Sequence, residues 1–368
     1  MSSEFILKKN ALQYFCDLHS HRAKQGTKAW KESRLYTIGG SEMSTLLGMN
    51  QYNSRKKLLQ SKFGFSTFTS SDATRWGNFF EPCGQMLLEK LFDCVIYETG
   101  CLPGSVPNTS YSPDGMSIIK RETIDKLIAD KILPEHKLPE NSVAALFEIK
   151  SPYSRIPTDK IPEEYKAQPQ CGLNYFDFLD IAYFINIMYR ICTLADLKTG
   201  NYYSNYSQKE EKSDFTKTIH FGIVGVYQKL GEFDLLNYDP KKKPKEDDEL
   251  RAVDLVEDDP ESINRIIRNV HDKFYEAIYF DVDEDVEISI AKYRAICDKN
   301  MFINIGIIPY KILRYELIPV EKEPGFIEKI KPVVEEFMEL MDKIRKMDND
   351  IERMEFINAF KEPRKSKK

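Results

Sequence analysis

The sequence predicts an α/β protein in which apolar strands alternate with amphipathic helices. Apolar, strand-like runs occur at 143–147, 180–191 and 302–320. Around them, apolar residues recur at helical spacing at 72–92 and 325–360. Hydrophobic residues make up 42% and charged residues 30% of the 368 positions, which is the composition of a globular protein with a real core. The length suits one large or two ordinary domains.

Composition also limits the classes of function and the locations to consider. No apolar run is long enough to cross a bilayer, and the start, Met1-Ser2-Ser3-Glu4, lacks the features of a secretory signal. Seven cysteines without a Cys-x-x-Cys pair favour reduced thiols and argue against zinc or iron–sulfur sites. We therefore expect an intracellular protein that is not secreted and has no membrane partner. The net charge of −5 argues only weakly against DNA binding, because a local basic groove is enough.

Helices and a glycine break are predicted in the first fifty residues. Residues 1–24 carry apolar side chains at helical spacing and predict a short arm. A second helix ends at Arg34, and Gly39-Gly40 then interrupts the chain so that Ser41 can cap a new helix. Such a start offers N–H groups and a hydroxyl to an anion, and Arg34 can add a bidentate phosphate contact. Taken alone, these residues are better explained as a helix cap and a surface charge.

A longer helix is predicted next and contains an unusual acid. A short helix and a Ser/Thr-rich loop at 54–71 lead to this helix, which Asp72 caps and which runs to about Phe92. Glu81 lies inside it, directly before Pro82. Because proline removes a backbone hydrogen bond and kinks a helix, Glu81 is a candidate for an inward-facing carboxylate. A lone glutamate in a helix is more often solvated.

Asp114 is the first of two acids with the pattern of a metal site. It lies in Tyr111-Ser112-Pro113-Asp114-Gly115, a turn signature with proline and glycine beside the acid. Strand-like segments at 94–97 and 116–119 flank this turn. An aspartate in such a turn is common for backbone reasons alone, so the turn suggests chemistry only together with other residues.

The triplet Glu148-Ile149-Lys150 supplies those residues at the end of the run at 143–147. Side chains alternate along a strand, so Glu148 and Lys150 share one face while Ile149 points into the core. Two acids and a lysine are thereby expected at the edge of an apolar sheet. Carboxylates are preferred ligands of Mg²⁺ and Mn²⁺, and a lysine can orient a metal-bound water. The arrangement is typical of metal-dependent nucleases, although Glu-x-Lys is often only a charge pair.

The middle of the chain adds a helix, a polar group and another strand. Residues 121–140 predict a helical insertion, and 180–191 predicts an apolar strand. Tyr165, Gln168 and Gln170 place two amides beside a tyrosine. This group predicts either a polar contact site or the exposed start of a helix, with comparable weight.

Residues 195–300 differ in character from the rest. They contain a polar tract at 201–212 and a charge run with prolines at 240–249, and both are expected to be solvated loops. An amphipathic helix is predicted from about 260 to 280. A strand, a long amphipathic helix and a basic tail then complete the chain.

Six short motifs follow one another along the chain. They are Trp30-x-x-x-Arg34, Gly39-Gly40-Ser41, Trp76-Gly77-x-x-x-Glu81-Pro82, Ser112-Pro113-Asp114-Gly115, Glu148-Ile149-Lys150-Ser151-Pro152 and Tyr165-x-x-Gln168-x-Gln170. Each is weak by itself, but six in this order are specific. Together they resemble the phage lambda-type exonuclease family, also described as YqaJ-like viral recombinases, whose members occur in phages and large DNA viruses. The resemblance covers residues 25–190 and resumes more faintly at 303–350.

The resemblance implies a restriction-endonuclease-like PD-(D/E)XK core, a mixed sheet flanked by helices with the active site at one sheet edge. The expected parts are an N-terminal arm at 1–24, a nuclease core at 25–194 with an insertion at about 117–145, a divergent insertion at 195–300, a strand and helix at 301–360 that complete the core, and a basic tail at 361–368. Family members usually have a shorter segment between the aspartate and Glu-x-Lys. Because 195–300 has no clear counterpart and could replace ring-forming contacts, the trimer of some members is not carried over.

The resemblance also implies an activity and a site. The activity is degradation of double-stranded DNA from a 5′ end, which leaves 3′ single strands for viral recombination or repair. Two Mg²⁺ or Mn²⁺ ions are expected. The implied metal ligands and catalytic acids are Asp114, Glu148 and Glu81, together with the main-chain carbonyl of Ile149. Lys150 would position the attacking water, and Gln168 would contact the site.

The DNA contacts and partners follow from the same resemblance. Arg34, Ser41 and Ser112 would grip the 5′ phosphate, and Gln170 and Tyr165 would contact the DNA. The expected partners are duplex DNA with a free, phosphorylated 5′ end and a single-strand annealing protein. The expected location is the host cytoplasm or a viral factory.

Two other functions stay open from the sequence. One is an endonuclease or single-strand nuclease built on the same core. The other is a non-catalytic protein that binds DNA ends and has kept the core. The second has less support, because both acids and the lysine are present.

Overall fold

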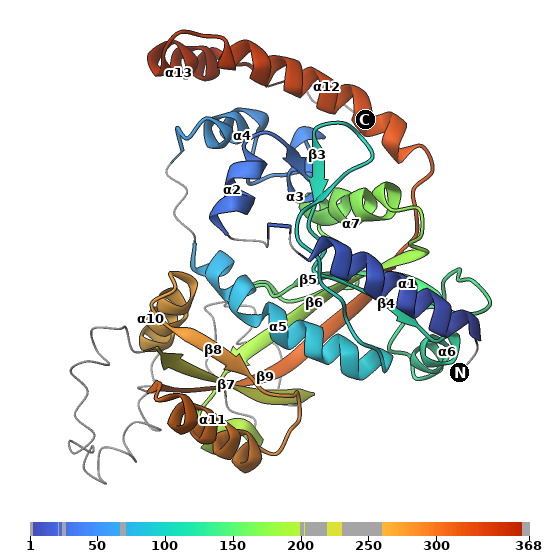
Figure 1. Ribbon diagram of the computed structural model, residues 1–368, viewed down its shortest axis with the longest axis vertical. Helices are drawn as coiled ribbons and strands as arrows, with labels where there is room; N and C mark the ends of the chain where they lie inside the picture. Colours follow the sequence, from blue (N-terminus) through green and yellow to red (C-terminus); the bar gives the residue numbers. More distant parts are fainter. Residues whose placement is uncertain are drawn as a thin grey trace.

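A six-stranded mixed sheet forms the centre of this computed structural model (Figure 1). The structure describes residues 3–20, 22–23, 27–66, 71–198, 202, 219–229 and 260–362, and the sheet is built from these. The strand order is β4 (Gly115–Ile119), β5 (Val143–Lys150), β6 (Ile181–Ile191), β9 (Ile303–Val320), β7 (His220–Gln228) and β8 (Glu276–Tyr279). Strands β5 and β6 are parallel, and the other neighbours are antiparallel. The predicted α/β class with a mixed sheet is confirmed.

One face of the sheet is covered by α5 (Asp72–Phe92), with α6 (Arg121–Ala129) and α10 (Pro260–His271) beside it. Aromatic side chains dominate this layer. Phe80 of α5 stacks on Tyr189 of β6, with ring centroids 4.5 Å apart. The ring centroids of Phe92 and Tyr183 lie 4.9 Å apart, with the rings tilted by 37°. This core buries the side of β5 that carries Ile149.

The opposite face carries a second core under α7 (Glu163–Tyr175). The other helices of this layer are α1 (Ser3–His19), α3 (Gly40–Leu46), α4 (Arg55–Lys62), α12 (Phe326–Arg345) and α13 (Asp350–Ala359). Helix α2 (Lys28–Arg34) precedes α3. A third cluster packs α11 (Val286–Asn300) and the 3₁₀ turn Ala195–Lys198 against the β7–β9 end of the sheet. Both faces of β5 are therefore covered, and its polar residues lie between layers.

A small sheet joins the N-terminal helices to the Asp114 turn. Strand β1 (Ile38–Gly39) pairs in parallel with β3 (Thr109–Tyr111), and β2 (Leu102–Pro103) pairs antiparallel on the other side of β3. The register sets Gly39 opposite Ser110. Since β1 leads directly into α3 and β3 leads directly into the Asp114 turn, this pairing brings two distant motifs together.

Helix starts in the first ninety residues differ from the prediction. Helix α3 begins at Gly40 with Gly39 as its N-cap, so Ser41 lies in the first turn and does not cap the helix. Ser71 caps α5, and Asp72 is the first helical residue. The Ser71 hydroxyl accepts a backbone N–H three residues later, the usual role of an N-cap serine. Pro82 does not end α5, which continues to Phe92 as predicted.

Two further elements also differ. The segment 94–97 forms no strand and contributes one bridge, between Tyr97 and Met116. The predicted single helix at 325–360 is two helices, because Asn349 caps a new one after a break. The strands at 143–150, 181–191 and 303–320 are confirmed.

The two predicted insertions are more closely built into the sheet than expected. At 117–145, Ser117 pairs with Ala145 in the β4–β5 ladder, so only α6 and its connections lie outside the sheet. Within 195–300, β7 and β8 extend the sheet beyond β9, and the helix predicted at 260–280 ends at His271 because β8 follows. Strand β5 lies between β4 and β6, so it is internal and not an edge strand. The loops at 201–212 and 240–249 lie outside the described residues, except for residue 202, and so do residues 363–368 of the tail.

The cysteines and the helices add two smaller observations. All seven cysteines are described, and none forms a disulfide. Burial raises the pKa of the Cys83 and Cys171 thiols to about 12, which keeps them protonated and unreactive. Across the described ranges, no helix combines the length and the apolar character that a membrane span requires.

Two glycines of α5 differ in the space around them. A Cβ on Gly84 would come within 2.7 Å of the Ile149 Cγ2 atom, so the helix lies close to β5 only because this side chain is absent. A Cβ on Gly77 would meet nothing within 4 Å. The close approach at Gly84 brings the helix that carries Glu81 against the strand that carries Glu148.

Alanine at these two positions should therefore have opposite effects on stability. Gly77→Ala should stabilise the protein by about 0.5–1 kcal/mol, because alanine removes the entropic cost of glycine in a helix. Gly84→Ala should destabilise it by about 1–3 kcal/mol through overpacking against Ile149. Urea unfolding followed by circular dichroism measures both, and a neutral or stabilising Gly84→Ala would contradict the packing described.

Candidate active site

Asp114 is held against the end of β5 by the backbone. It directly precedes β4, and the β4–β5 register sets the next residue, Gly115, opposite Phe147. The Asp114 Oδ2 atom accepts the Ile149 N–H at 2.8 Å. Asp114 is buried. The turn is therefore fixed to the strand at the middle residue of Glu148-Ile149-Lys150.

Glu148 and Lys150 share one face of β5, as the strand pattern predicts. The Lys150 Nζ atom donates to Glu148 Oε1 and lies 3.9 Å from Asp114 Oδ2. The other oxygen of Glu148 accepts the Tyr111 O–H at 3.0 Å. Glu148 is completely buried, so this carboxylate depends on Lys150 and Tyr111 for its hydrogen bonds.

Glycines make room for the tyrosine that reaches Glu148. A Cβ on Gly40 would come within 2.5 Å of the Tyr111 ring, and one on Gly172 of α7 would come within 2.9 Å. The ring is thereby enclosed between α3 and α7. On the same side, the Lys150 Nζ atom lies 5.4 Å from the centroid of the Tyr165 ring of α7. Helix α7 thus covers the polar face of β5.

Burial and repulsion shift the titration of the acids. Burial, and then the charge of Asp114, raise the pKa of Glu148 to about 7, although Lys150 opposes this shift. Burial also raises the pKa of Asp114. Burial acts to lower the pKa of Lys150, but the charges of Glu148 and Asp114 outweigh it and raise that pKa. Three charged groups therefore share a space from which water is largely excluded.

Glu81 is the third acid of this group. Burial, and then the charge of Asp114, raise its pKa to about 8. Glu148 and Glu98 raise it further, and Lys150 opposes them. The predicted inward-facing carboxylate on α5 is therefore close enough to the other two acids to interact with them electrostatically.

Gln85 connects α5 to the Asp114 turn. Its side-chain amide donates to the Asp114 carbonyl oxygen at 2.8 Å and to Glu98 at 2.7 Å. Gln85 follows Glu81 by four residues, so the two lie on one helix face. The sequence analysis missed Gln85, although this spacing could have revealed it.

The acids offer the donors that a hard divalent cation prefers. Asp114 and Glu148 present carboxylate oxygens around one ammonium group, and a cation would offset both the burial and the repulsion that raise the pKa of Glu148. Within the described residues, no three Asp, Glu, His or Cys side chains are grouped closely enough to hold an ion as they stand. Asp114 and Glu148 thus fit a metal as a pair, and Glu81 lies beside them.

The polar residues of α7 have separate surroundings. Gln168 is buried in the helix that lies over β5. The Gln170 amide donates to the Glu321 carbonyl at 2.7 Å and accepts the Glu323 N–H at 2.9 Å. The Gln170 side chain thus connects α7 to the segment between β9 and α12. Its contact to DNA, implied by the resemblance, stays a prediction.

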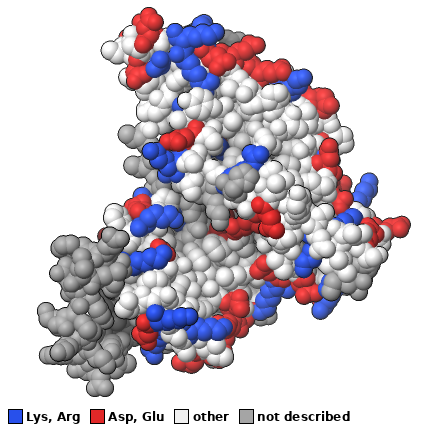
Figure 2. Space-filling model, viewed as in Figure 1, with Lys and Arg blue, Asp and Glu red and all other residues white. Residues whose placement is uncertain are grey.

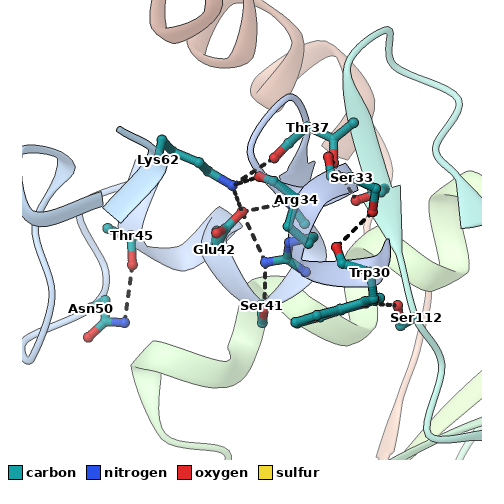
Figure 3. A network of polar contacts seen from close by, with 12 residues as sticks. Trp30, Ser33, Arg34, Thr37, Ser41, Glu42, Thr45, Asn50, Lys62 and Ser112 are labelled. Atoms are coloured by element: carbon teal, nitrogen blue, oxygen red, sulfur yellow. Dashed lines mark hydrogen bonds and ion pairs between the residues drawn. The ribbon is translucent and has the colours of Figure 1, made fainter. Parts of the chain in front are cut away.

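Arg34 lies in a network that joins α2, α3 and α4 (Figure 3). The Arg34 Nη2 atom lies 3.0 Å from Glu42 Oε2 and donates to the Ser41 hydroxyl at 3.3 Å. The same Glu42 oxygen accepts the Gly39 N–H at 2.8 Å. One backbone N–H that was expected to be open to an anion is therefore already paired, and Arg34 and Ser41 are adjacent as predicted.

Trp30 joins this network to the Asp114 turn. The Arg34 guanidinium carbon lies 5.0 Å from the centroid of the Trp30 ring. The Trp30 Nε1–H donates to the Ser112 hydroxyl at 3.1 Å. The contacts drawn in Figure 3 end at Ser112, which is only two residues before Asp114 in the chain. Arg34, Ser41 and Ser112 thus belong to one network, whose members Glu42 and Lys62 the sequence analysis missed.

Charged side chains are unevenly distributed on the face shown in Figure 2. Asp and Glu side chains gather near the centre of this face, while Lys and Arg side chains line its left-hand margin. A chain with a net charge of −5 therefore still offers local basic surface beside acidic residues.

Residues 29–175 match the YqaJ-like viral recombinase domain. This match confirms the resemblance predicted from the six motifs and covers the residues from Trp30 to Gln170. A protein of African swine fever virus is similar over nearly the whole chain. Its form in isolate Tick/Malawi/Lil 20-1/1983 is 23% identical over 361 residues, with 95% of each chain covered. The form in strain Badajoz 1971 Vero-adapted is 22% identical over 361 residues, with the same coverage.

Two solved structures of LHK-Exo, an alkaline exonuclease from Laribacter hongkongensis, are also similar to this chain. The complex of LHK-Exo with dAMP has 13% sequence identity and a TM-score of 0.40, covering 90% of this chain and 96% of that chain. The second structure has 19% identity and a TM-score of 0.31, covering 44% of this chain and 73% of that chain.

The raised pKa of Glu81 predicts a specific dependence of stability on pH in metal-free buffer. The pKa is about 8 in the folded protein against an ordinary value of 4.5, so the folded state holds the proton more tightly. Raising the pH from about 5 to about 8 should therefore destabilise the wild type, and Glu81→Gln should lose much less stability over this range.

Thermal unfolding in EDTA near pH 5.5 and near pH 8.5 measures this difference. Glu122→Gln, which removes an exposed carboxyl on α6, is the control and should behave like the wild type. If Glu81→Gln follows the wild type at both pH values, Glu81 does not titrate within the cluster.

Proposed function

We propose that this protein is a metal-dependent 5′→3′ exonuclease of double-stranded DNA that produces 3′ single-stranded overhangs. The observation that carries the proposal is the connection between two clusters. The Arg34 network reaches Ser112 through Trp30, and Ser112 lies two residues before Asp114, a reach of about 7 Å along an extended chain. A terminal phosphate held by the first cluster would leave the neighbouring phosphodiester near the second.

The acidic cluster has the chemistry of a phosphodiester hydrolase. Asp114, Glu148, the Ile149 carbonyl and Glu81 are the groups that would hold Mg²⁺ or Mn²⁺. When bound, such ions polarise the phosphate, activate water and stabilise the leaving oxygen. The Asp114 turn followed by Glu148-Ile149-Lys150 on β5, with β6 parallel beside it, is in keeping with a restriction-endonuclease-like PD-(D/E)XK core.

The residues of the chain itself have distinct roles in this proposal. Lys150, which already contacts both acids, holds the attacking water and offsets charge on the phosphate. The Tyr111 hydroxyl fixes one oxygen of Glu148 and leaves the other for the site. Gln168 and Tyr165, on the helix that covers β5, contact the scissile strand.

End dependence follows from the basic cluster. Arg34 offers a guanidinium, and Ser41 and Ser112 offer hydroxyls, which together suit a terminal phosphate dianion. A phosphate inside a continuous strand carries a single charge and has no free end to enter this space. A charge-assisted contact to a dianion is stronger than one to a neutral hydroxyl, so a 5′-phosphorylated end should bind better than a 5′-hydroxyl end.

A role in viral DNA recombination or repair is supported by the match to the YqaJ-like viral recombinase domain. The 3′ strands produced would be substrates for an annealing protein. Such a nuclease would act in the host cytoplasm or in a viral factory, on duplex DNA with a free 5′ end.

Digestion of end-labelled DNA with defined 5′ chemistry tests the proposal. With Mg²⁺ or Mn²⁺, linear duplex carrying a 5′ phosphate should be degraded from that end, 5′-hydroxyl duplex more slowly, and closed circular duplex not at all. Asp114→Asn and Lys150→Met should each lower the rate by about 1,000-fold or more while duplex binding persists, because both act on the reaction step. Rapid nicking of circles would instead indicate an endonuclease, and wild-type cleavage by Asp114→Asn would refute the metal site.

Binding of Mn²⁺ should release protons and strengthen with pH. Because the pKa values of Glu148 and Glu81 are about 7 and about 8, a cation must displace protons from carboxyl groups near neutral pH. Calorimetry near pH 6.5 and near pH 8.5, in buffers of different ionisation enthalpy, measures the affinity and the protons released. Folded protein that binds no Mn²⁺ at either pH would favour a non-catalytic DNA-end-binding protein.

A further inference from the structure

One member of the Arg34 network is a buried lysine that belongs to none of the six motifs. Lys62 is the last residue of α4, and only 3% of its side chain is exposed. In Figure 3 its ammonium points toward Glu42, Thr37 and the backbone of Arg34. No substrate can reach so enclosed a group, so Lys62 must act through its neighbours.

The hydrogen bonds of Lys62 indicate that it is charged, although burial, opposed by Glu42, lowers its pKa. Its Nζ atom donates to the Thr37 carbonyl at 2.8 Å, to Glu42 Oε2 at 2.8 Å and to the Arg34 carbonyl. Three acceptors require three N–H donors, which only the ammonium form has. Burial of such a charge is costly unless an opposite charge is near, and Glu42 provides one.

Glu42 is shared between two cations. Its Oε2 atom lies 2.8 Å from Lys62 Nζ and 3.0 Å from Arg34 Nη2. Although burial acts to raise its pKa, the charges of Arg34 and Lys62 lower it, so Glu42 is ionised. Two positive charges and one negative charge therefore occupy this network, and one positive charge is left over.

Removal of Lys62 would abolish the net positive charge of this network. Glu42 and Arg34 would then form a closed pair with no net charge, and a phosphate entering beside Arg34 would meet the Glu42 carboxylate without compensation. With Lys62 present, the Lys62 ammonium offsets the charge of Glu42, while Glu42 still holds Arg34 in place beside Ser41. The guanidinium can then be oriented by an acid without losing its attraction for an anion.

We propose that Lys62 sets the charge of the terminal-phosphate pocket: by binding Glu42 it leaves Arg34 with an uncompensated positive charge for a phosphate dianion. The inference rests on the proposed function and assigns to Lys62 and Glu42 the selectivity for phosphorylated ends. Lys62 is a positioning residue and does not touch DNA.

A charge-restoring double variant separates this role from a purely structural one. Lys62→Met should reduce the preference for 5′-phosphate over 5′-hydroxyl duplex by about tenfold or more, because the Glu42 charge then offsets the charge of Arg34 that attracts the dianion. Lys62→Met with Glu42→Gln removes one charge of each sign, restores the net positive charge and should regain most of the preference. A lysine that only fastened α4 to α2 would give the opposite result, since the double variant loses still more contacts.

The readout is the ratio of the dissociation constants of the two duplexes, measured by fluorescence anisotropy in Ca²⁺ at low salt. Lys57→Met, on the exposed side of α4, is the matched control and should keep the wild-type ratio. Glu42→Gln alone leaves every bond of Lys62 to a backbone carbonyl in place and should raise the preference. If Lys62→Met does not fold, Glu42→Gln tests the proposal instead. A preference of Glu42→Gln for the 5′-phosphate duplex that is unchanged or lower than in the wild type would overturn the proposal.

The remaining outcomes distinguish this inference from the function on which it rests. A wild-type protein without any phosphate preference would overturn the terminal pocket, and the role of Lys62 with it. A preference that survives in Lys62→Met, or a double variant no better than the single one, would overturn only the role of Lys62.

Discussion

The hydrogen bond from the Ile149 N–H to the Asp114 carboxylate is the contact on which the site depends. It joins a turn to a strand, and both are fixed independently, the turn by β3 and β4 and the strand by its neighbours on either side. Asp114 therefore reaches Glu148 and Lys150 without any loop having to order on binding. Such preorganisation is what a charged site needs, because reorienting charges during the reaction costs free energy.

The molecule contains two buried clusters of charged side chains with opposite net charge. Around β5, two acids surround one lysine and a third acid is nearby, so acidic groups are in excess. Burial, and then the repulsion between them, raises the pKa values of Glu81 and Glu148. Around Arg34, two cations share one acid and positive charge is in excess. The acidic cluster and the basic cluster lie on either side of Ser112. A DNA end with a bound divalent cation carries the complementary charges, so the same complex would relieve both.

Local patterns in the sequence predicted the parts of the site that lie within one element. Strand alternation placed Glu148 and Lys150 on one face, and the proline beside Glu81 marked an acid that does lie near Asp114. Contacts between elements were not predictable in this way. Tyr111 reaches Glu148 only because Gly40 and Gly172, from distant helices, leave room for its ring. Lys62 looked like any other lysine of a short helix, since its burial depends on three segments meeting.

The sheet shows the same limit on a larger scale. The alternation at 143–150 identified a strand but not its neighbours, so β5 was expected near an edge. Its internal position results from β4 on one side and β6 on the other. The sheet also includes β7, from a region in which the sequence predicted loops and a helix but no strand. Nothing in the spacing of Gln170 indicated that its amide binds the backbone beyond β9. Tertiary pairing decided these positions, and a single sequence carries little signal for it.

The place of β9 between β6 and β7 has a consequence for synthesis of the chain. Strand β9 pairs along nearly all of β6, yet residues 192–302 separate the two. Until the ribosome has made residue 320, β6 presents an open row of backbone donors and acceptors on an apolar strand, a state prone to intermolecular pairing. The nascent protein therefore has to be kept from self-association until its last quarter emerges, and a fragment ending near residue 195 would keep that open strand permanently.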